Sequence, residues 1–228
     1  MLINAMHQAD SFLSGEADQW FARNREALAT RRPENDPIMA AIGRLGITPR
    51  RAVELGAANG YRLNWLHEQY GTDGVGIEPS AAAVADGRTR FAHLKLEQGL
   101  AHDIARLDGP FDLVIFGFCL YLVDRDGLFG LAAAVDQALA SGGHLAIYDF
   151  QPPMPLRNAY AYKAGLFSFK LDYGAMFAWN PAYIPIYRHI TDHDGRPFSG
   201  HPNEAVGVTV LKKVPGRYAY ARGDAFSA

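Results

Sequence analysis

The sequence contains a single cysteine, Cys119, among 228 residues. One cysteine excludes an internal disulfide framework and any zinc site built from several cysteines, and it fits a reducing cytoplasm. An excess of charge of one sign is also lacking, because 22 lysines and arginines stand against 24 acidic residues and leave a net charge of −2. This balance argues against a nucleic-acid-binding protein that depends on neutralising phosphates.

Long apolar runs are missing as well. No stretch reaches the roughly 20 residues that a bilayer crossing requires. Residues 1–20 lack the basic start and the apolar core of a secretory signal. We therefore expect a cytoplasmic protein that binds neither a membrane nor nucleic acid. Apolar residues still make up 49% of the chain and charged residues 20%, which is typical of a globular protein.

The chain divides into four segments of different texture. Residues 1–37 are mixed and polar, with an amphipathic helix expected near 16–30, and they are expected to form a helical lid. Residues 38–150 alternate short apolar runs with helical stretches and are expected to form the core. Residues 151–185 are rich in aromatics and proline and are expected to form a cap, and residues 186–228 are expected to add a terminal β-hairpin.

Short apolar runs in the core segment alternate with helical patterns. The run FDLVIFGF is nearly continuous apolar sequence, which is typical of a strand buried on both faces of a parallel sheet. The expected strands are 51–55, 74–79, 93–98, 111–118 and 144–150, and the expected helices are 61–70, 80–90 with Ser80 as N-cap, and 124–139 ended by the glycines of 141–143. Such alternation predicts a doubly wound, mostly parallel α/β sheet.

Two more strands are expected near the end of the chain. Residues 184–192 and 204–213 flank the polar turn DHDGRPFSGHPN, and too few residues separate them for a crossover helix. Neighbours of this kind pair antiparallel. The expected fold is therefore α/β, with a mostly parallel seven-stranded sheet that carries an antiparallel terminal hairpin.

A run of small residues follows the first expected strand, in the segment VELGAANGYRLNWL. Gly56, Ala58 and Gly60 let the backbone approach a ligand that lies across the carboxyl ends of the strands. Glu78 ends the next strand, where a carboxylate can accept hydrogen bonds from both hydroxyls of a ribose. A nicotinamide or flavin enzyme would need glycine at Ala58 and at Tyr61, so a nucleoside ligand without phosphates is favoured.

The ordered set of turn, acid, fourth strand and terminal hairpin resembles the class I S-adenosylmethionine-dependent methyltransferase family, over about residues 38–213. The family's first motif is an acid followed by G-x-G-x-G, matched here by Glu54, Gly56, Ala58 and Gly60 with alanine at the central glycine. The resemblance implies the Rossmann-like methyltransferase fold. It also implies S-adenosylmethionine as cofactor and S-adenosylhomocysteine as product.

Further cofactor contacts are implied by the same resemblance. The family's loop after the third strand usually reads Gly-Asp-Ala beside the adenine, but this chain has Gln98, Gly99 and Leu100, so the usual aspartate is missing. The end of the fourth strand would lie near the methionine part of the cofactor. The implied cofactor-binding residues are Glu54, Gly56, Ala57, Ala58, Gly60, Glu78, Pro79, Gly99, Leu100, Phe116, Gly117 and Phe118.

The expected substrate pocket is dry and aromatic, because a cationic methyl donor is favoured beside aromatic faces and water competes poorly there. Its walls are expected from Cys119 to Tyr121 after the fourth strand and from residues 151–185, where the family commonly places a cap. The expected substrate-binding residues are Tyr160, Lys163, Lys170, Tyr173, Trp179 and His189. A buried aromatic cluster under a long loop is the alternative for this segment.

Methyl transfer needs a general base only if the acceptor must lose a proton, as an alcohol must. Asp149 is the first candidate because it ends the fifth strand, where ligands gather in such sheets. Tyr121 and His102 complete the expected catalytic set. His189 and His193 fall in a strand and a turn without a convincing metal-ligand spacing, so no metal is expected.

We therefore expect an enzyme that transfers a methyl group from S-adenosylmethionine to oxygen or nitrogen of a small metabolite, such as a sugar or a natural-product intermediate. The small-molecule substrate is the only partner that this interpretation requires. A nicotinamide-dependent oxidoreductase and a non-catalytic binding module with the same fold stay open as alternatives. The sequence does not fix the oligomeric state, and a homodimer is left open.

Overall fold

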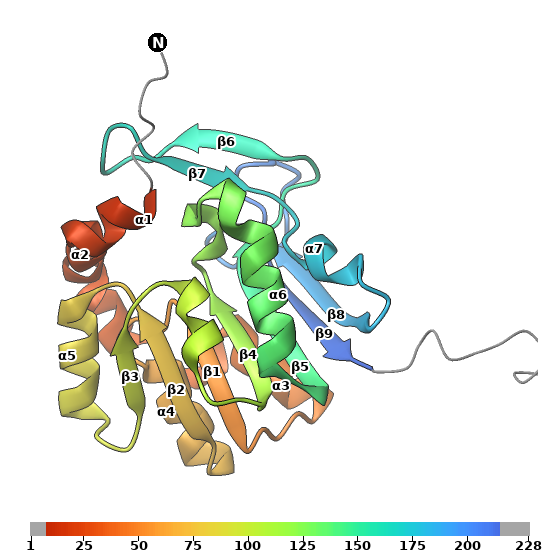
Figure 1. The fold of residues 1–228 in the computed structure, drawn as a ribbon. Coiled ribbons are helices and arrows are strands. Elements are labelled where there is room, and N and C mark those ends of the chain that lie inside the picture. Colours follow the sequence, from red (N-terminus) through yellow and green to blue (C-terminus); the bar gives the residue numbers. More distant parts are fainter. Residues whose placement is uncertain (1–7, 215–228) are drawn as a thin grey trace, which may run out of the picture.

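The computed structural model describes residues 8–214. Residues 1–7 of the expected lid and residues 215–228 of the expected terminal segment lie outside the described residues. Within the described part, seven strands form one sheet and two strands form a separate hairpin (Figure 1). The strands of the sheet are β1 Arg51–Leu55, β2 Asp73–Glu78, β3 Lys95–Gln98, β4 Phe111–Gly117, β5 Leu139–Phe150, β8 Tyr183–Thr191 and β9 Val206–Lys213, and those of the hairpin are β6 Leu156–Ala159 and β7 Phe167–Lys170.

The order of strands in the sheet is β3-β2-β1-β4-β5-β9-β8. Strands β1 to β5 pair in parallel with their neighbours among themselves, whereas β9 pairs antiparallel with both β5 and β8. Leu55 at the end of β1 lies beside Ile77 of β2 and Phe116 of β4, so the carboxyl ends of these strands form one edge. This arrangement confirms the predicted α/β sheet with an antiparallel terminal hairpin.

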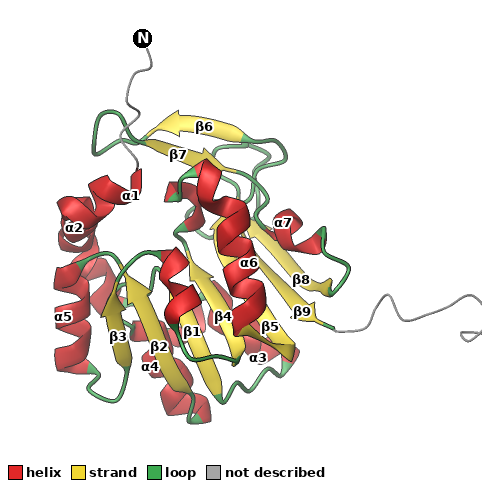
Figure 2. Cartoon of the chain, in the orientation of Figure 1, coloured by secondary structure: helices red, strands yellow, loops and turns green. Residues whose placement is uncertain are grey.

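Helices cover both faces of the sheet (Figure 2). On one face lie α3 (Pro37–Leu45), α4 (Tyr61–Tyr70) and α5 (Ala81–Arg90), whose apolar residues share one core with the strands. On the other face lie α6 (Leu128–Ala138) and α7 (Gly174–Ala178), which contribute to a second core. None of the described helices has the length and apolarity that a bilayer crossing requires.

Strand β4 contributes side chains to both of these cores. Val114 and Phe116 pack in the core on the α6 side, and Leu113 and Ile115 pack in the core on the α3 side. All four side chains are fully buried. The nearly continuous apolar run is therefore explained by burial on two faces, as expected for a central parallel strand.

Side-chain caps fix the starts of two helices. Asp36 accepts hydrogen bonds from the Ile38 and Met39 amides, each at 3.0 Å, at the start of α3. Ser80 accepts one from the Ala83 amide at 3.0 Å, at the start of α5. The predicted N-cap at Ser80 is thus confirmed, and each cap satisfies amides that have no partner within the helix.

The helix predicted over 124–139 is shorter than expected. Arg125–Gly127 forms a 3₁₀ turn before α6, and β5 begins directly after α6 ends. The prediction that Ser141–Gly143 end this helix is wrong, because these residues lie within β5. The pairing of β5 with β4 shifts register there, and Gly142 has a φ of 81°. A residue in the left-handed region bends the strand, and glycine adopts that conformation at little cost.

The N-terminal helices and the hairpin both lie over the carboxyl edge of the sheet (Figure 1). The N-terminal helices comprise α1 (Gln8–Ser11), a π-helical turn (Phe12–Glu16) and α2 (Ala17–Thr30). The bounds of α2 are close to those of the helix predicted near 16–30. The Gln8 side chain joins the two regions by accepting a hydrogen bond from the Phe167 amide of β7 at 2.6 Å. The other short helical turns are 3₁₀ turns at Pro33–Asn35, Ala101–Arg106 and Leu120–Leu122.

Candidate functional site

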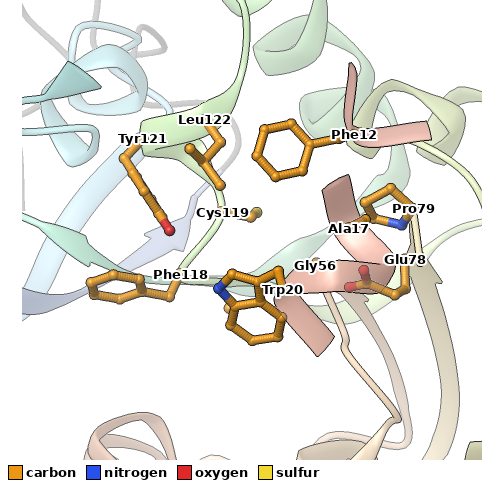
Figure 3. A pocket seen from close by; sticks show the side chains of 11 residues that line it. Phe12, Ala17, Trp20, Gly56, Glu78, Pro79, Phe118, Cys119, Tyr121 and Leu122 are labelled. Atoms are coloured by element: carbon orange, nitrogen blue, oxygen red, sulfur yellow. The ribbon is translucent and has the colours of Figure 1, made fainter. Parts of the chain in front are cut away.

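A hollow lies at the carboxyl ends of β1, β2 and β4, beneath the N-terminal helices (Figure 3). We call it the crest pocket. It has two adjoining parts, which share Phe12, Gly56, Pro79, Cys119 and Leu122. The Glu78 part adds Ala17, Trp20, Glu78, Gly117, Phe118 and Tyr121, and the His102 part adds Ala9, Leu100, Ala101, His102, Val123 and Asp124.

The turn after β1 forms the floor of this pocket. Gly56 has a φ of 74° and donates its amide to the Ile77 carbonyl at 2.9 Å. A Cβ atom on Gly56 would lie 2.7 Å from the Cβ of Cys119, so any side chain at this position would clash with Cys119. Ala58 also has a positive φ, 49°, and its amide points toward β2 and donates to the Glu78 carboxylate.

Glu78 places a carboxylate on the wall of the pocket, at the end of β2. Its two oxygens accept hydrogen bonds from the Ala58 amide at 2.9 Å and the Ser80 amide at 3.0 Å. Burial raises the pKa of Glu78 to about 7, and the two amides oppose this rise. Figure 3 shows both oxygens on the pocket side of the chain. Since each carboxylate oxygen can accept more than one hydrogen bond, Glu78 retains acceptor capacity toward a ligand.

The loop after β3 borders the His102 part of the pocket. The Leu100 amide donates to Asp103 at 2.9 Å, so this nearby aspartate is engaged with its own loop. Gly99 lies against the same carboxylate, where a Cβ atom would come within 2.4 Å of an Asp103 oxygen. His102 lines the pocket, and its Nε2 makes a 2.9 Å hydrogen bond with the Gly127 carbonyl.

The chain after β4 forms the opposite wall. Gly117 and Phe118 line the Glu78 part, and Phe118 has a φ of 69°. Its ring packs against Tyr121, Tyr148 and Phe150, with centroid distances between 5.0 and 5.4 Å. Phe118 is therefore held in an aromatic cluster at the end of the pocket that is farthest from Glu78 (Figure 3).

Asp149 lies behind this wall instead of in the pocket. Its carboxylate accepts hydrogen bonds from the amides of Leu120 at 2.8 Å, Phe150 at 2.8 Å and Tyr121 at 3.4 Å. Burial raises the pKa of Asp149 to about 7, against the effect of these amides. The structure thus makes Asp149 an anchor for the turn that carries Tyr121, and Tyr121 itself lines the pocket.

Comparison with known proteins gives two findings. Residues 52–143 match the family model of a methyltransferase domain. The fold matches solved structures of S-adenosylmethionine-dependent methyltransferases over most of the chain. Residues 52–143 therefore form a methyltransferase domain, within a fold that S-adenosylmethionine-dependent methyltransferases share. This confirms the resemblance seen in the sequence, and S-adenosylmethionine is the cofactor of this methyltransferase family.

Three of the similar structures illustrate the match of the methyltransferase fold. The first is 1,6-didemethyltoxoflavin-N1-methyltransferase of Burkholderia thailandensis, with 1,6-didemethyltoxoflavin and S-adenosylhomocysteine bound; it is 15% identical, with a TM-score of 0.69, and the match covers 94% of this chain and 92% of that one. The N-methyltransferase NodS of Bradyrhizobium japonicum WM9, with S-adenosylhomocysteine, is 17% identical with a TM-score of 0.58, covering 86% and 98%. The glycopeptide N-methyltransferase MtfA is 19% identical with a TM-score of 0.58, covering 79% and 97%. A sequence comparison with curated proteins gives no match.

The first acid of the methyltransferase motif, Glu54, does not line the pocket. It is fully buried behind the turn, where its carboxylate accepts a hydrogen bond from Arg62. Arg62 is itself buried and also donates to Asp36, with its Nη2 2.9 Å from an Asp36 oxygen. Burial raises the pKa of Glu54 to about 7, and its Oε2 has no hydrogen-bond partner among the described residues. Phe116 likewise faces the core, where it packs against Phe177.

The expected substrate-binding residues are dispersed over the methyltransferase fold. Tyr160 lies near the pocket and packs its ring against Phe12 at 5.9 Å. Lys170 is buried under the hairpin, where its Nζ donates to the Asn203 carbonyl at 2.8 Å, and Lys163 lies half-buried in the hairpin turn.

Three other expected residues lie away from the crest pocket. The hydroxyl of Tyr173 is buried and donates to the Phe169 carbonyl at 2.6 Å. Trp179 follows α7 and is 88% exposed. His189 is exposed on β8 and lines a separate hollow beside α3. The structure therefore does not bring these three side chains to the pocket of the methyltransferase domain.

The N-terminal helices of the expected lid supply pocket residues that were not among the expected binding residues. Phe12 lines both parts of the pocket, and Ala17 and Trp20 line the Glu78 part. Glu16 is buried beside them and pairs with Arg23 at 2.7 Å. The amphipathic pattern near 16–30 was the available signal, but it does not tell which element a helix covers. No group of three or more potential metal ligands occurs among residues 8–214.

Proposed function

We propose that this protein transfers the methyl group of S-adenosylmethionine to oxygen or nitrogen of a small metabolite, such as a sugar or a natural-product intermediate. The observation that carries the proposal is the position of Glu78. A buried carboxylate that faces a pocket, one turn away from a bare glycine backbone, is what a ribose with two hydroxyl donors requires.

The remaining parts of this cofactor are also assigned to the crest pocket. We assign the ribose to Glu78, the adenine to the His102 part beside Leu100, and the methionine part to the Glu78 part beside Gly117. Gly56 supports the assignment, since it lines both parts of the pocket without a side chain and a Cβ atom there would collide with Cys119. Glu54 lies on the core side of the turn after β1, and we propose that it holds Arg62 and this turn in place.

The chain's own contribution to the reaction is positioning and exclusion of water. When bound, the cofactor supplies a methyl group on a sulfonium sulfur that is already activated. Phe12, Trp20 and Leu122 cover the pocket with apolar surface, and Phe118 and Tyr121 close its end (Figure 3). Such walls hold the reacting groups in line and reduce competition from water.

Residues 1–37 and 151–185 are proposed to act as lid and cap over the core of residues 38–150 and 186–228. The described contacts between the two regions support this division. Glu16 in the lid accepts a hydrogen bond from the Tyr160 hydroxyl in the cap at 3.2 Å, and Arg23 lies over the Tyr162 ring at 4.1 Å.

A small acceptor is favoured over a macromolecule. Phe12, Ala17 and Trp20 of the lid line the pocket, and the chain has no basic excess to attract nucleic acid. The similar Burkholderia enzyme holds the small molecule 1,6-didemethyltoxoflavin together with S-adenosylhomocysteine.

Calorimetry with S-adenosylhomocysteine and with NADH tests the proposal. We expect S-adenosylhomocysteine to bind and NADH not to bind. Binding of NADH alone would favour an oxidoreductase instead. Binding of neither would refute the assignment of the crest pocket to a nucleoside ligand.

A further inference from the structure

Two polar side chains face one another across the end of the crest pocket. Trp20 extends from α2, and Tyr121 extends from the turn after β4. Figure 3 shows the indole nitrogen of Trp20 and the phenol oxygen of Tyr121 directed toward the same space, next to Phe118. This is the end of the pocket opposite Glu78, where an acceptor would approach the methionine part of the cofactor.

Neither of these polar atoms has a hydrogen-bond partner in the described part of the chain. The hydrogen bonds that Trp20 and Tyr121 make there use only their backbone atoms, at the Trp20 carbonyl and the Tyr121 amide. Both side chains are half-buried, and tyrosine and tryptophan normally satisfy their polar ends where they are buried. An indole N–H and a phenol O–H that both face a ligand pocket are therefore available to a bound molecule.

The described carboxylates near the pocket are engaged elsewhere. Asp124, in the His102 part, accepts from the Gln8 and Ala9 amides at 3.0 and 3.1 Å. Asp149 accepts from three backbone amides behind the wall. Glu78 accepts from two amides at the proposed ribose position. Glu16 is paired with Arg23 and also accepts from the Tyr160 hydroxyl. None of these described carboxylates faces the space between Trp20 and Tyr121.

Other groups that could take a proton are also poorly placed or too weakly acidic. His102 lies in the other part of the pocket and is bonded to Gly127. His193 packs against the Phe118 ring at 5.8 Å and lines a separate hollow. Burial raises the pKa of the Cys119 thiol and of the Tyr121 phenol well above their ordinary values, so neither is ionised near neutral pH.

From this arrangement we propose that the methyl acceptor is a neutral nitrogen, an amine or a ring N–H, positioned by Trp20 and Tyr121. The proposal rests on the proposed function and narrows its choice between oxygen and nitrogen. An alcohol must lose its proton as it reacts and so needs a base, whereas a neutral amine already presents a lone pair. The described residues offer no base at this place.

The two side chains also constrain the shape of the acceptor. The phenol oxygen of Tyr121 can accept a hydrogen bond from the N–H of the reacting nitrogen. The indole of Trp20 can only donate, so it requires a second acceptor atom on the substrate, such as a carbonyl or hydroxyl oxygen. The substrate class is therefore a neutral nitrogen compound that carries a hydrogen-bond acceptor close to the reacting nitrogen.

The reaction balances without a further reagent. The lone pair of the nitrogen forms the new N–C bond as the S–C bond breaks, and the electrons of that bond remain on sulfur in S-adenosylhomocysteine. The positive charge passes to the nitrogen, which then releases its proton to water.

The first test identifies the atom that receives the methyl group. The protein is incubated with S-adenosylmethionine carrying a ¹³C-labelled methyl group and with a small-molecule extract of its native host, and the products are analysed by ¹H–¹³C correlation NMR. We expect an N-methyl signal. An O-methyl or C-methyl signal would overturn the inference and leave methyl transfer intact, whereas the absence of any labelled product would overturn the proposed function itself.

The second test separates the acceptor pair from the cofactor site. Trp20→Phe and Tyr121→Phe each remove one polar atom and retain an aromatic ring, and Tyr70→Phe at the far end of α4 is the matched control. We expect S-adenosylhomocysteine affinity, measured by calorimetry, to change less than twofold in all three. Labelling of the nitrogen acceptor should fall at least tenfold in the first two variants only. Unchanged labelling in both would overturn the assignment of the pair.

Discussion

The carboxylate of Asp149 accepts a hydrogen bond from the backbone amide of Leu120 at 2.8 Å. The bond crosses from the end of β5 to the turn after β4, and the neighbouring Tyr121 amide points to the same oxygen. Asp149 therefore fixes the backbone from which Tyr121 enters the pocket. This role differs from the general base expected from its position at a strand end, because its lone pairs are directed to backbone amides.

Asp149→Asn should destabilise the protein, because the amide group offers only one acceptor oxygen to amides that are buried. A buried donor left without a partner costs about 1–3 kcal/mol. Urea unfolding at constant pH measures this loss. A variant of unchanged stability that has lost methyl transfer would instead support a role for Asp149 as a base.

The pH dependence of the unfolding free energy tests the role of Asp149 independently. Burial raises the pKa of Asp149 from 3.8 to about 7, so the folded protein binds this proton more tightly than the unfolded chain. The contribution of such a group is fully present below about pH 4 and is lost as pH rises through about 7. Unfolding free energy should therefore fall less steeply between pH 5 and pH 8, roughly, in Asp149→Asn than in the wild type.

Glu78→Ala should weaken binding of S-adenosylhomocysteine at least tenfold, which corresponds to about 1.4 kcal/mol. The lost carboxylate is the proposed acceptor for the ribose hydroxyls. Because burial raises the pKa of Glu78 to about 7, wild-type affinity should also decline as pH falls through about 7 and the carboxylate becomes protonated. Calorimetry over this range, with the exposed Glu26→Gln as control, measures both effects. An equal dissociation constant for wild type and Glu78→Ala would show that the ribose lies elsewhere.

Gly56→Ala should reduce both stability and cofactor binding. Its φ of 74° costs a residue with a side chain roughly 1–2 kcal/mol, and the new Cβ would lie 2.7 Å from that of Cys119. Gly130→Ala is the matched control, because Gly130 is exposed within α6 and a Cβ there meets nothing within 4 Å. That control should gain about 0.5–1 kcal/mol from higher helix propensity. Equal melting temperatures for the two variants would contradict the requirement for glycine at position 56.

Cys119 allows the occupancy of the pocket to be measured chemically, since it is the single cysteine of the chain. Its thiol donates to the Leu55 carbonyl at 3.2 Å, and burial raises its pKa well above the ordinary value, so alkylation should be slow. Cys119 lines both parts of the pocket, so saturating S-adenosylhomocysteine should slow N-ethylmaleimide addition further. Intact-mass spectrometry measures the rate, with urea-unfolded protein as the fully reactive reference. A rate that does not respond to the ligand would place the cofactor away from Cys119.

Features set by local spacing could be predicted from the sequence. The small residues from Gly56 to Gly60 and the acid at Glu78 follow consecutive strands, and parallel pairing brings strand ends together. The apolar run of β4 was equally informative, because burial on two faces leaves little freedom in residue choice. The fold, the turn and the position of Glu78 at the strand end therefore follow from short stretches of sequence.

Contacts between distant segments could not be predicted in the same way. Trp20 reaches the pocket only because α2 docks over the edge of the sheet, and its helical pattern does not specify that partner. Asp149 was correctly placed at a strand end, but its hydrogen bonds depend on the path of the turn after β4. Trp179 was expected at the pocket because it lies in the 151–185 segment, and His189 because a strand residue could reach the pocket from the sheet edge. Both side chains are exposed away from the pocket, after α7 and on β8.

Arg62→Met should be the most destabilising of these substitutions, because it leaves Asp36 and Glu54 buried without their shared cation. Breaking a buried ion pair by removing one partner costs about 3–5 kcal/mol. Replacing the whole group is often much less harmful, since no charge is then left unpaired. The triple variant Asp36→Asn, Glu54→Gln, Arg62→Met keeps a side-chain cap on α3 and should recover a large part of the loss. Urea unfolding of both variants measures the difference, and a triple variant no more stable than Arg62→Met would show that lost packing, rather than unpaired charge, causes the effect.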